Sequence, residues 1–194
     1  MLAILLLTVL AASSAPAPRP DGDALLYPLG CSYSGPIELT PVDHCASHGS
    51  GLPHLAPQVV ADLAYDHGLA SIAIAGKGWF YRRRDGRMVQ MVTFDNGPDP
   101  FSEGLARAIV KGRLAFVDRR LRLRFVTRYT AAEPFRHGRA IVCTGCVETP
   151  VDDGEHSYMS GGRWGVIDRR GREIIPPTQP YSHFAATAER LGLR

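Results

Sequence analysis

Residues 164–172 read Trp-Gly-Val-Ile-Asp-Arg-Arg-Gly-Arg, and the rest of the chain is best interpreted from this stretch. Two weaker copies lie upstream: residues 79–87 read Trp-Phe-Tyr-Arg-Arg-Arg-Asp-Gly-Arg, and residues 114–122 read Leu-Ala-Phe-Val-Asp-Arg-Arg-Leu-Arg. A unit that recurs at a fixed period predicts a repeat architecture, in which each unit shelters the apolar face of its neighbour.

Other landmarks keep the same period. A Gly-x-Ala tripeptide precedes each copy, at residues 68–70, 104–106 and 138–140, and a phenylalanine closes each unit, at Phe101, Phe135 and Phe184. These landmarks predict three units at about residues 68–101, 102–135 and 136–184. The third unit is longer than the others, which indicates an insertion at about residues 143–158.

Each unit has the local chemistry of a β-hairpin. In the third copy Asp168 and Gly171 take the first and fourth positions of a turn, where the carboxylate accepts backbone N–H bonds and glycine tolerates positive φ. The second copy has Leu121 in place of that glycine, which predicts a different or a strained turn. The residues expected to form the core are Leu69, Ile72, Ile74, Trp79, Tyr81, Leu105, Ile109, Phe116, Phe125, Ile141, Trp164, Ile167 and Ile174.

The units resemble WG repeats, also called KWG repeats, of a bacterial family whose pattern runs Gly-Leu-Ala, then Trp-Gly-x-Ile-Asp-x-x-Gly, then an apolar segment and Phe. The resemblance covers about residues 60–184 and is closest in the third unit. It implies an all-β protein of tandem β-hairpin repeats stacked side by side. The family has no established activity, so the resemblance carries over no catalytic residue. The positions with a structural role in the repeat are Trp164, Gly165, Ile167, Asp168 and Gly171, together with Trp79 and Leu114 at the equivalent of Trp164.

The two ends of the chain differ from the repeats in composition. Residues 1–17 contain an apolar run followed by small residues, and this run is shorter than the roughly 20 residues of a membrane-spanning helix, so it predicts a secretory signal peptide. Residues 18–60 are rich in Pro and Gly and show little periodicity, whereas residues 185–194 have the composition of a short capping helix.

The four cysteines support export to an oxidising compartment, where an even number of cysteines favours disulfides. The simplest pairing is Cys31 with Cys45 and Cys143 with Cys146, although a cross-link between the N-terminal segment and the insertion remains open. Two alternatives exist for these residues. Cys143 and Cys146 could serve a thiol–disulfide enzyme, or the cysteines could bind zinc together with His44, His48 and His54.

Arginines recur at the three predicted hairpin tips. If the units stack in register, these side chains line one edge of the protein and suit phosphate or carboxylate groups. The two sets at equivalent positions are Arg84, Arg119 and Arg169, and Arg87, Arg122 and Arg172. The alternative is that they keep the hairpin ends soluble. Residues 95–100, Asp-Asn-Gly-Pro-Asp-Pro, predict a tight turn in which Asn96 and Gly97 supply positive φ.

Taken together, the sequence predicts an exported bacterial protein, periplasmic or secreted, with no catalytic residues, metal or cofactor. It presents a binding surface for a protein or an anionic envelope polymer. The net charge of +3 is too small by itself to indicate nucleic acid or membrane binding, and no nucleotide-binding loop is present. The sequence leaves the oligomeric state undetermined.

Overall fold

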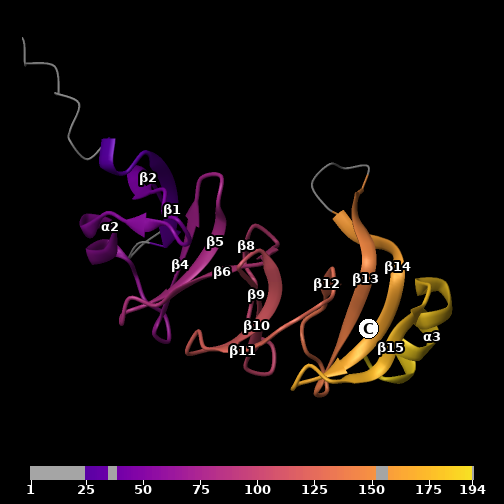
Figure 1. Ribbon diagram of the computed structural model, residues 1–194. Coiled ribbons are helices and arrows are strands. Elements are labelled where there is room, and N and C mark those ends of the chain that lie inside the picture. Colours follow the sequence, from indigo (N-terminus) through magenta and orange to yellow (C-terminus); the bar gives the residue numbers. More distant parts are fainter. Residues whose placement is uncertain (1–24, 35–38, 152–156, 194) are drawn as a thin grey trace, which may run out of the picture.

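The computed structural model describes residues 25–34, 39–151 and 157–193. The predicted signal peptide lies outside the described residues. Figure 1 shows the strands arranged in a row, from the N-terminal strands at one end to helix α3 at the other. The predicted all-β architecture is confirmed, because antiparallel strands form three sheets and the helices of the described part, α2 (Pro57–Asp62) and α3 (Tyr181–Arg190), are short.

The first two units form three-stranded antiparallel meanders of the same design. The strands of the first unit are β4 (Leu69–Ile74), β5 (Gly78–Arg83) and β6 (Met88–Met91), and those of the second are β9 (Leu105–Val110), β10 (Arg113–Asp118) and β11 (Leu123–Val126). A tight turn with two successive positive φ values leads into each unit, at His67 and Gly68, at Glu103 and Gly104, and at His137 and Gly138. This is the conformation that type I′ turns require, and it explains the recurring glycine.

The N-terminal segment is more regular than its composition suggests. Its strands β1 (Leu29–Ser34), β2 (Leu39–Ser47) and β3 (His54–Leu55) extend the sheet of the first unit. Strand β1 pairs with β4, with Cys31 opposite Ile74, and buries Cys45 and Val59 in one apolar cluster with Ile72 and Phe80. This segment therefore covers the outer face of the first unit, a role that terminal caps fulfil in stacked proteins.

The units do not all stack in the same way, which refines the prediction of repeats lying side by side. Strand β6 pairs with both β5 and β9, so the first two units and the N-terminal strands share one nine-stranded sheet. After β11 the chain bends through residues 127–130 before β12 (Ala131–Ala132) pairs with the third unit. The third unit consequently has its own sheet, in the order β12-β13-β14-β15.

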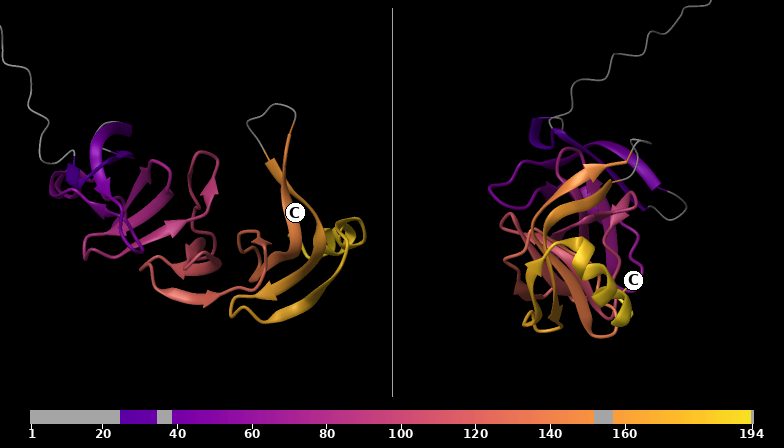
Figure 2. Two further views of the ribbon diagram at one scale, coloured as in Figure 1. Left: turned by 45° about the horizontal axis from the view of Figure 1, so that its top comes forward. Right: turned by 90° about the vertical axis from the view of Figure 1, so that its right-hand side faces the viewer.

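The sheet of the third unit contains two long strands, β13 (Arg139–Pro150) and β14 (Ser157–Asp168), followed by β15 (Glu173–Gln179). The inner parts of β13 and β14 correspond to the repeat, and their outer parts contain most of the predicted insertion. Figure 2 shows this outer hairpin projecting away from the body of the protein. A smaller hairpin, β7 (Thr93–Phe94) and β8 (Gly97–Pro98), occupies the predicted turn at residues 95–100, but its positive φ values belong to Asp95 and Asn96 rather than to Asn96 and Gly97.

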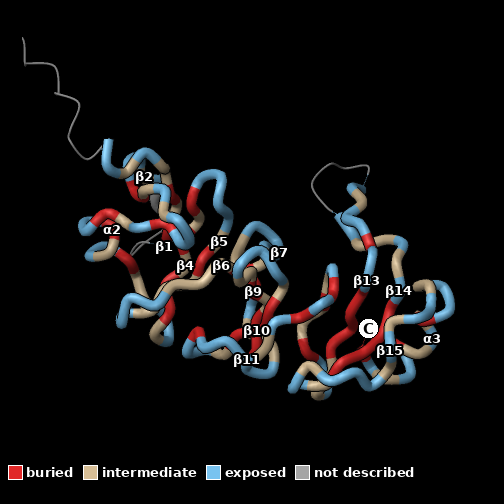
Figure 3. The backbone as a smooth tube through the Cα atoms, in the orientation of Figure 1, coloured by how far each residue is buried: buried red, intermediate tan, exposed pale blue. Residues whose placement is uncertain are grey.

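Buried residues follow the strands where neighbouring units face each other (Figure 3). The second and third units join through a cluster whose fully buried members include Phe116, Phe135 and Ile167. Five predicted core residues are less buried than expected: Ile174 is 47% exposed, and Trp79, Tyr81, Ile109 and Phe125 are only partly buried. Phe80 takes the buried position in strand β5 because successive strand residues point to opposite faces.

Helix α3 covers the last sheet. It starts at Tyr181, earlier than the predicted boundary of 185, and buries Phe184 and Ala188 against Trp164 and Val166. The Tyr181 and Trp164 rings meet edge to face, with their centroids 5.0 Å apart. The helix thus shields the face that a fourth unit would otherwise cover.

Candidate functional site

The three hairpin tips that carry the repeated arginines share one backbone geometry. The fourth turn residue donates its N–H to the carbonyl of the first: Gly86 to Arg83 at 3.1 Å, Leu121 to Asp118 at 2.7 Å, and Gly171 to Asp168 at 2.9 Å. All three donors have positive φ, and Leu121 adopts +54° despite its Cβ. Of the two sequence-based alternatives for Leu121, the structure has the strained version of the same turn. The burial of the Leu121 side chain compensates for the strain of this positive φ, because the residue is 3% exposed in a cluster with Leu69 and Met91 of the first unit.

The acidic side chains at the tips bind the backbone of their own turns. Asp118 Oδ1 accepts the N–H groups of Arg120 and Arg122 at 2.9 and 3.0 Å, and Asp168 Oδ1 accepts those of Arg170 and Arg172 at 2.9 Å each. In the first unit Asp85 accepts the N–H of Arg87 at 3.0 Å, and this bond is the main reason why the pKa of Asp85 is lowered. These carboxylates therefore stabilise the turns and are held close to the backbone.

Arginine side chains connect the tip of one unit to its neighbour. Arg87 Nη1 donates to the Arg120 carbonyl at 2.7 Å, and Arg83 Nη1 donates to the Arg119 carbonyl at 3.3 Å, which brings the first two tips side by side. Arg169 Nη2 donates to the Glu103 carbonyl at 2.5 Å, so the third tip lies against the turn that leads into the second unit. These contacts support the prediction that the three tips lie along one side of the protein.

Two of the repeated arginines lie over aromatic rings. The Arg84 guanidinium carbon is 4.3 Å from the centroid of the Tyr65 ring, and that of Arg119 is 5.0 Å from the centroid of Phe101. Tyr65 and Phe101 occupy equivalent positions immediately before the leading turns of the first two units. In the third unit the pattern changes, because the equivalent Phe135 is fully buried and Arg169 binds Glu103 instead.

All six repeated arginines are exposed, and we call this set the arginine edge: Arg84, Arg87, Arg119, Arg122, Arg169 and Arg172. Its members have different partners. Arg172 Nε donates to Asp168 Oδ2 at 2.7 Å, whereas Arg122 is bonded in the described structure only through its backbone. Arg87 and Arg169 have structural contacts, so Arg84, Arg119 and Arg122 are the members best placed to meet a ligand.

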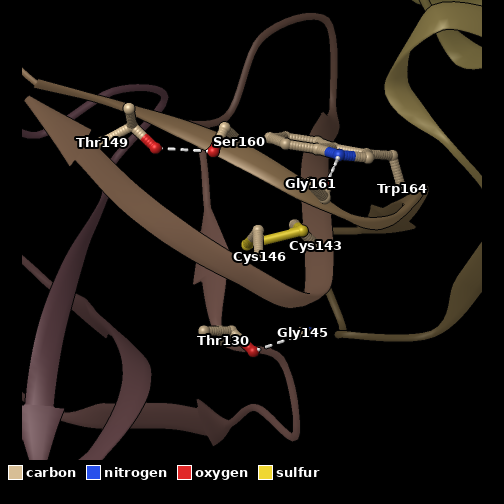
Figure 4. The surroundings of a disulfide bond; sticks show 8 residues. All are labelled: Thr130, Cys143, Gly145, Cys146, Thr149, Ser160, Gly161 and Trp164. Carbon is tan, nitrogen blue, oxygen red and sulfur yellow. Dashed lines mark hydrogen bonds between the residues drawn. A yellow bond between two sulfur atoms is a disulfide. The ribbon is translucent and has the colours of Figure 1, made fainter. Parts of the chain in front are cut away.

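The cysteines form the two disulfides of the simplest predicted pairing. Cys31 bonds to Cys45 and Cys143 bonds to Cys146, with Cα–Cα distances of 5.7 and 6.0 Å. Figure 4 shows the second bridge beside the Trp164 indole, whose Nε1 donates to the Gly161 carbonyl at 2.7 Å. Cys143 and Cys146 are 0% and 3% exposed, and within the described part of the chain no three His, Cys, Asp or Glu residues are grouped as a metal site requires.

The residues of the Trp-Gly stretch each have a defined structural environment. Trp164 and Ile167 are buried on opposite sides of β14, in the clusters that face α3 and the second unit respectively. Gly165 lies under β15, where an added Cβ would be 2.4 Å from the Ile175 carbonyl oxygen. Gly171 packs on the Phe125 ring, where a Cβ added to the glycine would be 2.8 Å from Phe125 Cδ2. The two glycines therefore allow backbone and ring to approach closely.

Sequence reasoning missed one buried charge. Asp99 is fully buried and pairs with Arg107, whose side chain is 12% exposed. Residues 95–100 have the composition of a turn, so Asp99 was interpreted as a loop residue and its pairing with Arg107 was not predicted.

The comparisons with known proteins agree with this geometry. The family described as the WG containing repeat matches residues 164–178, from the buried tryptophan through the third tip into β15. No curated protein and no solved structure matches the chain. In the described residues, no helix is both long and apolar enough to cross a membrane. Residues 164–178 of the chain therefore form a WG repeat, and the family match supports the WG-type interpretation of the third unit.

Proposed function

We propose that this chain is a non-catalytic binding protein, exported from a bacterial cell, whose arginine edge engages an anionic partner. The observation that supports this most directly is the bond from Arg87 to the Arg120 carbonyl, since it aligns the first two tips. This alignment supports a shared basic surface that includes Arg84, Arg119 and Arg122. Carboxylate, phosphate and sulfate groups are the partners that guanidinium N–H groups bind best.

The surroundings of these arginines favour ligand binding over internal pairing. Arg84 and Arg119 stack on aromatic rings, and this stacking reduces the side-chain conformational freedom that would be lost on binding. The N–H groups in the plane of each guanidinium stay available to donate to a ligand. Asp118 and Asp168 are engaged by turn backbone groups, as described above. The tips therefore present an excess of positive charge, although the chain as a whole carries only +3.

Export is supported by the two disulfides, because such bonds persist mainly in oxidising compartments. The burial of Cys143 and Cys146 gives no support to the alternative of a thiol–disulfide enzyme, which needs an accessible sulfur.

Retention on an anionic resin, such as heparin or sulfopropyl matrix, tests the proposal. The triple variant Arg84→Gln, Arg119→Gln and Arg122→Gln should elute at clearly lower salt and bind a soluble polyanion at least about tenfold more weakly. The matched control, Lys77→Gln, Lys111→Gln and Arg163→Gln, removes the same charge away from the tips. Lys77 and Lys111 lie in the turns at the opposite strand ends. Equal losses for the two triple variants would show that net charge alone governs retention, and the proposal would fail.

A further inference from the structure

Each unit departs from the repeat at one place, and the three departures line a single cleft. In the first unit the departure is the β7–β8 hairpin with Phe94, in the second it is the bend at residues 127–130, and in the third it is the outer β13–β14 hairpin with Tyr158. The cleft has a volume of about 810 Å³. These segments lie outside the three-stranded meanders that define the repeat, so their convergence on one cavity suggests a role beyond folding.

The lining of the cleft is mixed, with polar side chains and two apolar portions. Ile109 and Leu114, which are paired across β9 and β10, form one wall, while Tyr158 and Met159 of β14 form another. Phe94 and Tyr158 are 50% and 57% exposed, and the Arg107 guanidinium carbon lies 5.9 Å from the centroid of the Phe94 ring. A volume of this size matches the range of about 300–1,000 Å³ typical of small-molecule sites.

The floor of the cleft contains polar groups that are not fully paired. Thr127 is 5% exposed, and its hydroxyl has no hydrogen-bond partner within the described part of the chain. Beside it, Arg113 donates one bond, from Nη2 to the Thr127 carbonyl at 3.0 Å. A buried polar atom without a partner is costly, so a ligand atom or water that reached it would be stabilising.

The charges in the cleft leave one arginine uncompensated. Arg107 pairs with Asp99, and Arg128 pairs with Glu173. The acidic residue of the lining, Glu148, lies on the outer hairpin and accepts a bond from Ser157. Among the described residues no ion pair neutralises Arg113. The cleft therefore combines the exposed positive charge of Arg113 with apolar portions of its wall.

We propose that this cleft binds a small molecule with a flat apolar body and one anionic group, a carboxylate or sulfonate. The body lies between Phe94, Leu114 and Tyr158, and the anionic group meets the Arg113 guanidinium next to the Thr127 hydroxyl. This site is separate from the arginine edge and does not depend on the function proposed for it.

Two fluorescent probes of similar shape test the proposal on the full chain. The first is 8-anilinonaphthalene-1-sulfonate, which carries an anionic group, and the second is N-phenyl-1-naphthylamine, which lacks it. The sulfonate should bind saturably and at least about tenfold more tightly than the neutral probe, as expected for one charge-assisted hydrogen bond. Arg113→Gln should remove this advantage and leave binding of the neutral probe unchanged.

Variants of the walls provide the second measurement. Phe94→Ser with Tyr158→Ser should weaken both probes by at least about tenfold. The control, Leu123→Ser with Ile174→Ser, changes two residues of similar exposure outside the cleft and should leave binding unchanged. The triple variant of the arginine edge should also bind the sulfonate normally. The proposal is overturned if the sulfonate does not bind saturably, if Arg113→Gln has no effect, or if the control loses as much binding as the wall variant.

Discussion

The buried Asp99 carboxylate is bound by two parts of Arg107 at once. The Arg107 backbone N–H donates to Oδ2 at 2.6 Å and its Nε donates to Oδ1 at 3.0 Å, while Nη1 continues to the Ala132 carbonyl at 2.8 Å. Asp99 lies near the end of the first unit, Arg107 lies in β9 of the second, and Ala132 lies in β12, which pairs with the sheet of the third. The ion pair thus connects the first and second units, and the same arginine is hydrogen-bonded to the sheet of the third unit.

Removing one partner of this pair should be strongly destabilising. Asp99→Ala is expected to lower the free energy of unfolding by about 3–5 kcal/mol, because it leaves the Arg107 cation buried without a counterion. The double variant Asp99→Ala with Arg107→Leu should lose less than the sum of the two single losses. Urea denaturation of the three variants measures these values. A loss below about 1 kcal/mol for Asp99→Ala would contradict the assigned role.

The positive φ of Leu121 leads to an unusual order of stabilities. Leu121→Ala should cost about 2–5 kcal/mol through lost burial and still carry the strain of a Cβ at this φ. Leu121→Gly should be about 1 kcal/mol more stable than the alanine variant, since glycine relieves that strain. In the control pair Val117→Ala and Val117→Gly, in regular strand β10, glycine should be the less stable variant. The same order at both positions would refute the strained turn.

Gly165→Ala tests the reason for the glycine after Trp164. The added Cβ would meet the Ile175 oxygen at 2.4 Å and Pro177 N at 2.7 Å, so β15 must move. We expect a loss of about 1–3 kcal/mol or more, measured by thermal or urea unfolding. Gly51→Ala, whose Cβ meets nothing within 4 Å, is the control and should be nearly neutral.

Glu173 should make stability sensitive to acid. Its pKa lies below the ordinary 4.5, chiefly because the Arg128 side chain donates to it and secondly because the Tyr129 hydroxyl does so at 2.9 Å. A lowered pKa in the folded state means that the stabilisation is fully present above pH 4.5 and is lost as the pH falls through the folded-state pKa. Glu173→Gln should therefore be less stable than the native chain at pH 7. The difference should shrink below pH 4.5, as followed by unfolding at a series of pH values.

Both disulfides should resist reduction while the protein is folded. All four cysteines are at most 5% exposed, so a thiolate cannot approach their sulfurs in line. Thiol counting should give no free thiol after treatment with millimolar dithiothreitol, and four once urea is added. Rapid reduction of Cys143–Cys146 in the folded state would instead favour exchange chemistry.

Local patterns were sufficient to predict the hairpins and their tips. The Asp168 to Gly171 turn, the recurring Gly-x-Ala and the arginine positions follow from short-range chemistry, which depends little on the rest of the chain. The Cys31–Cys45 and Cys143–Cys146 pairs were the simplest pairing for the same reason. Leu121 was recognised as an exception, but its burial against the first unit, which makes the strain tolerable, depends on a residue far away in sequence.

The sequence by itself determined that this protein is all-β, that it repeats, and where its turns lie, because turn and strand preferences act over a few neighbouring residues. Only the tertiary structure decided that the sheet breaks after β11, that Asp99 is buried against Arg107, and that segments of all three units line one cleft. These features arise from contacts between units. Their free energy depends on how whole strands pack, and no single unit carries that information.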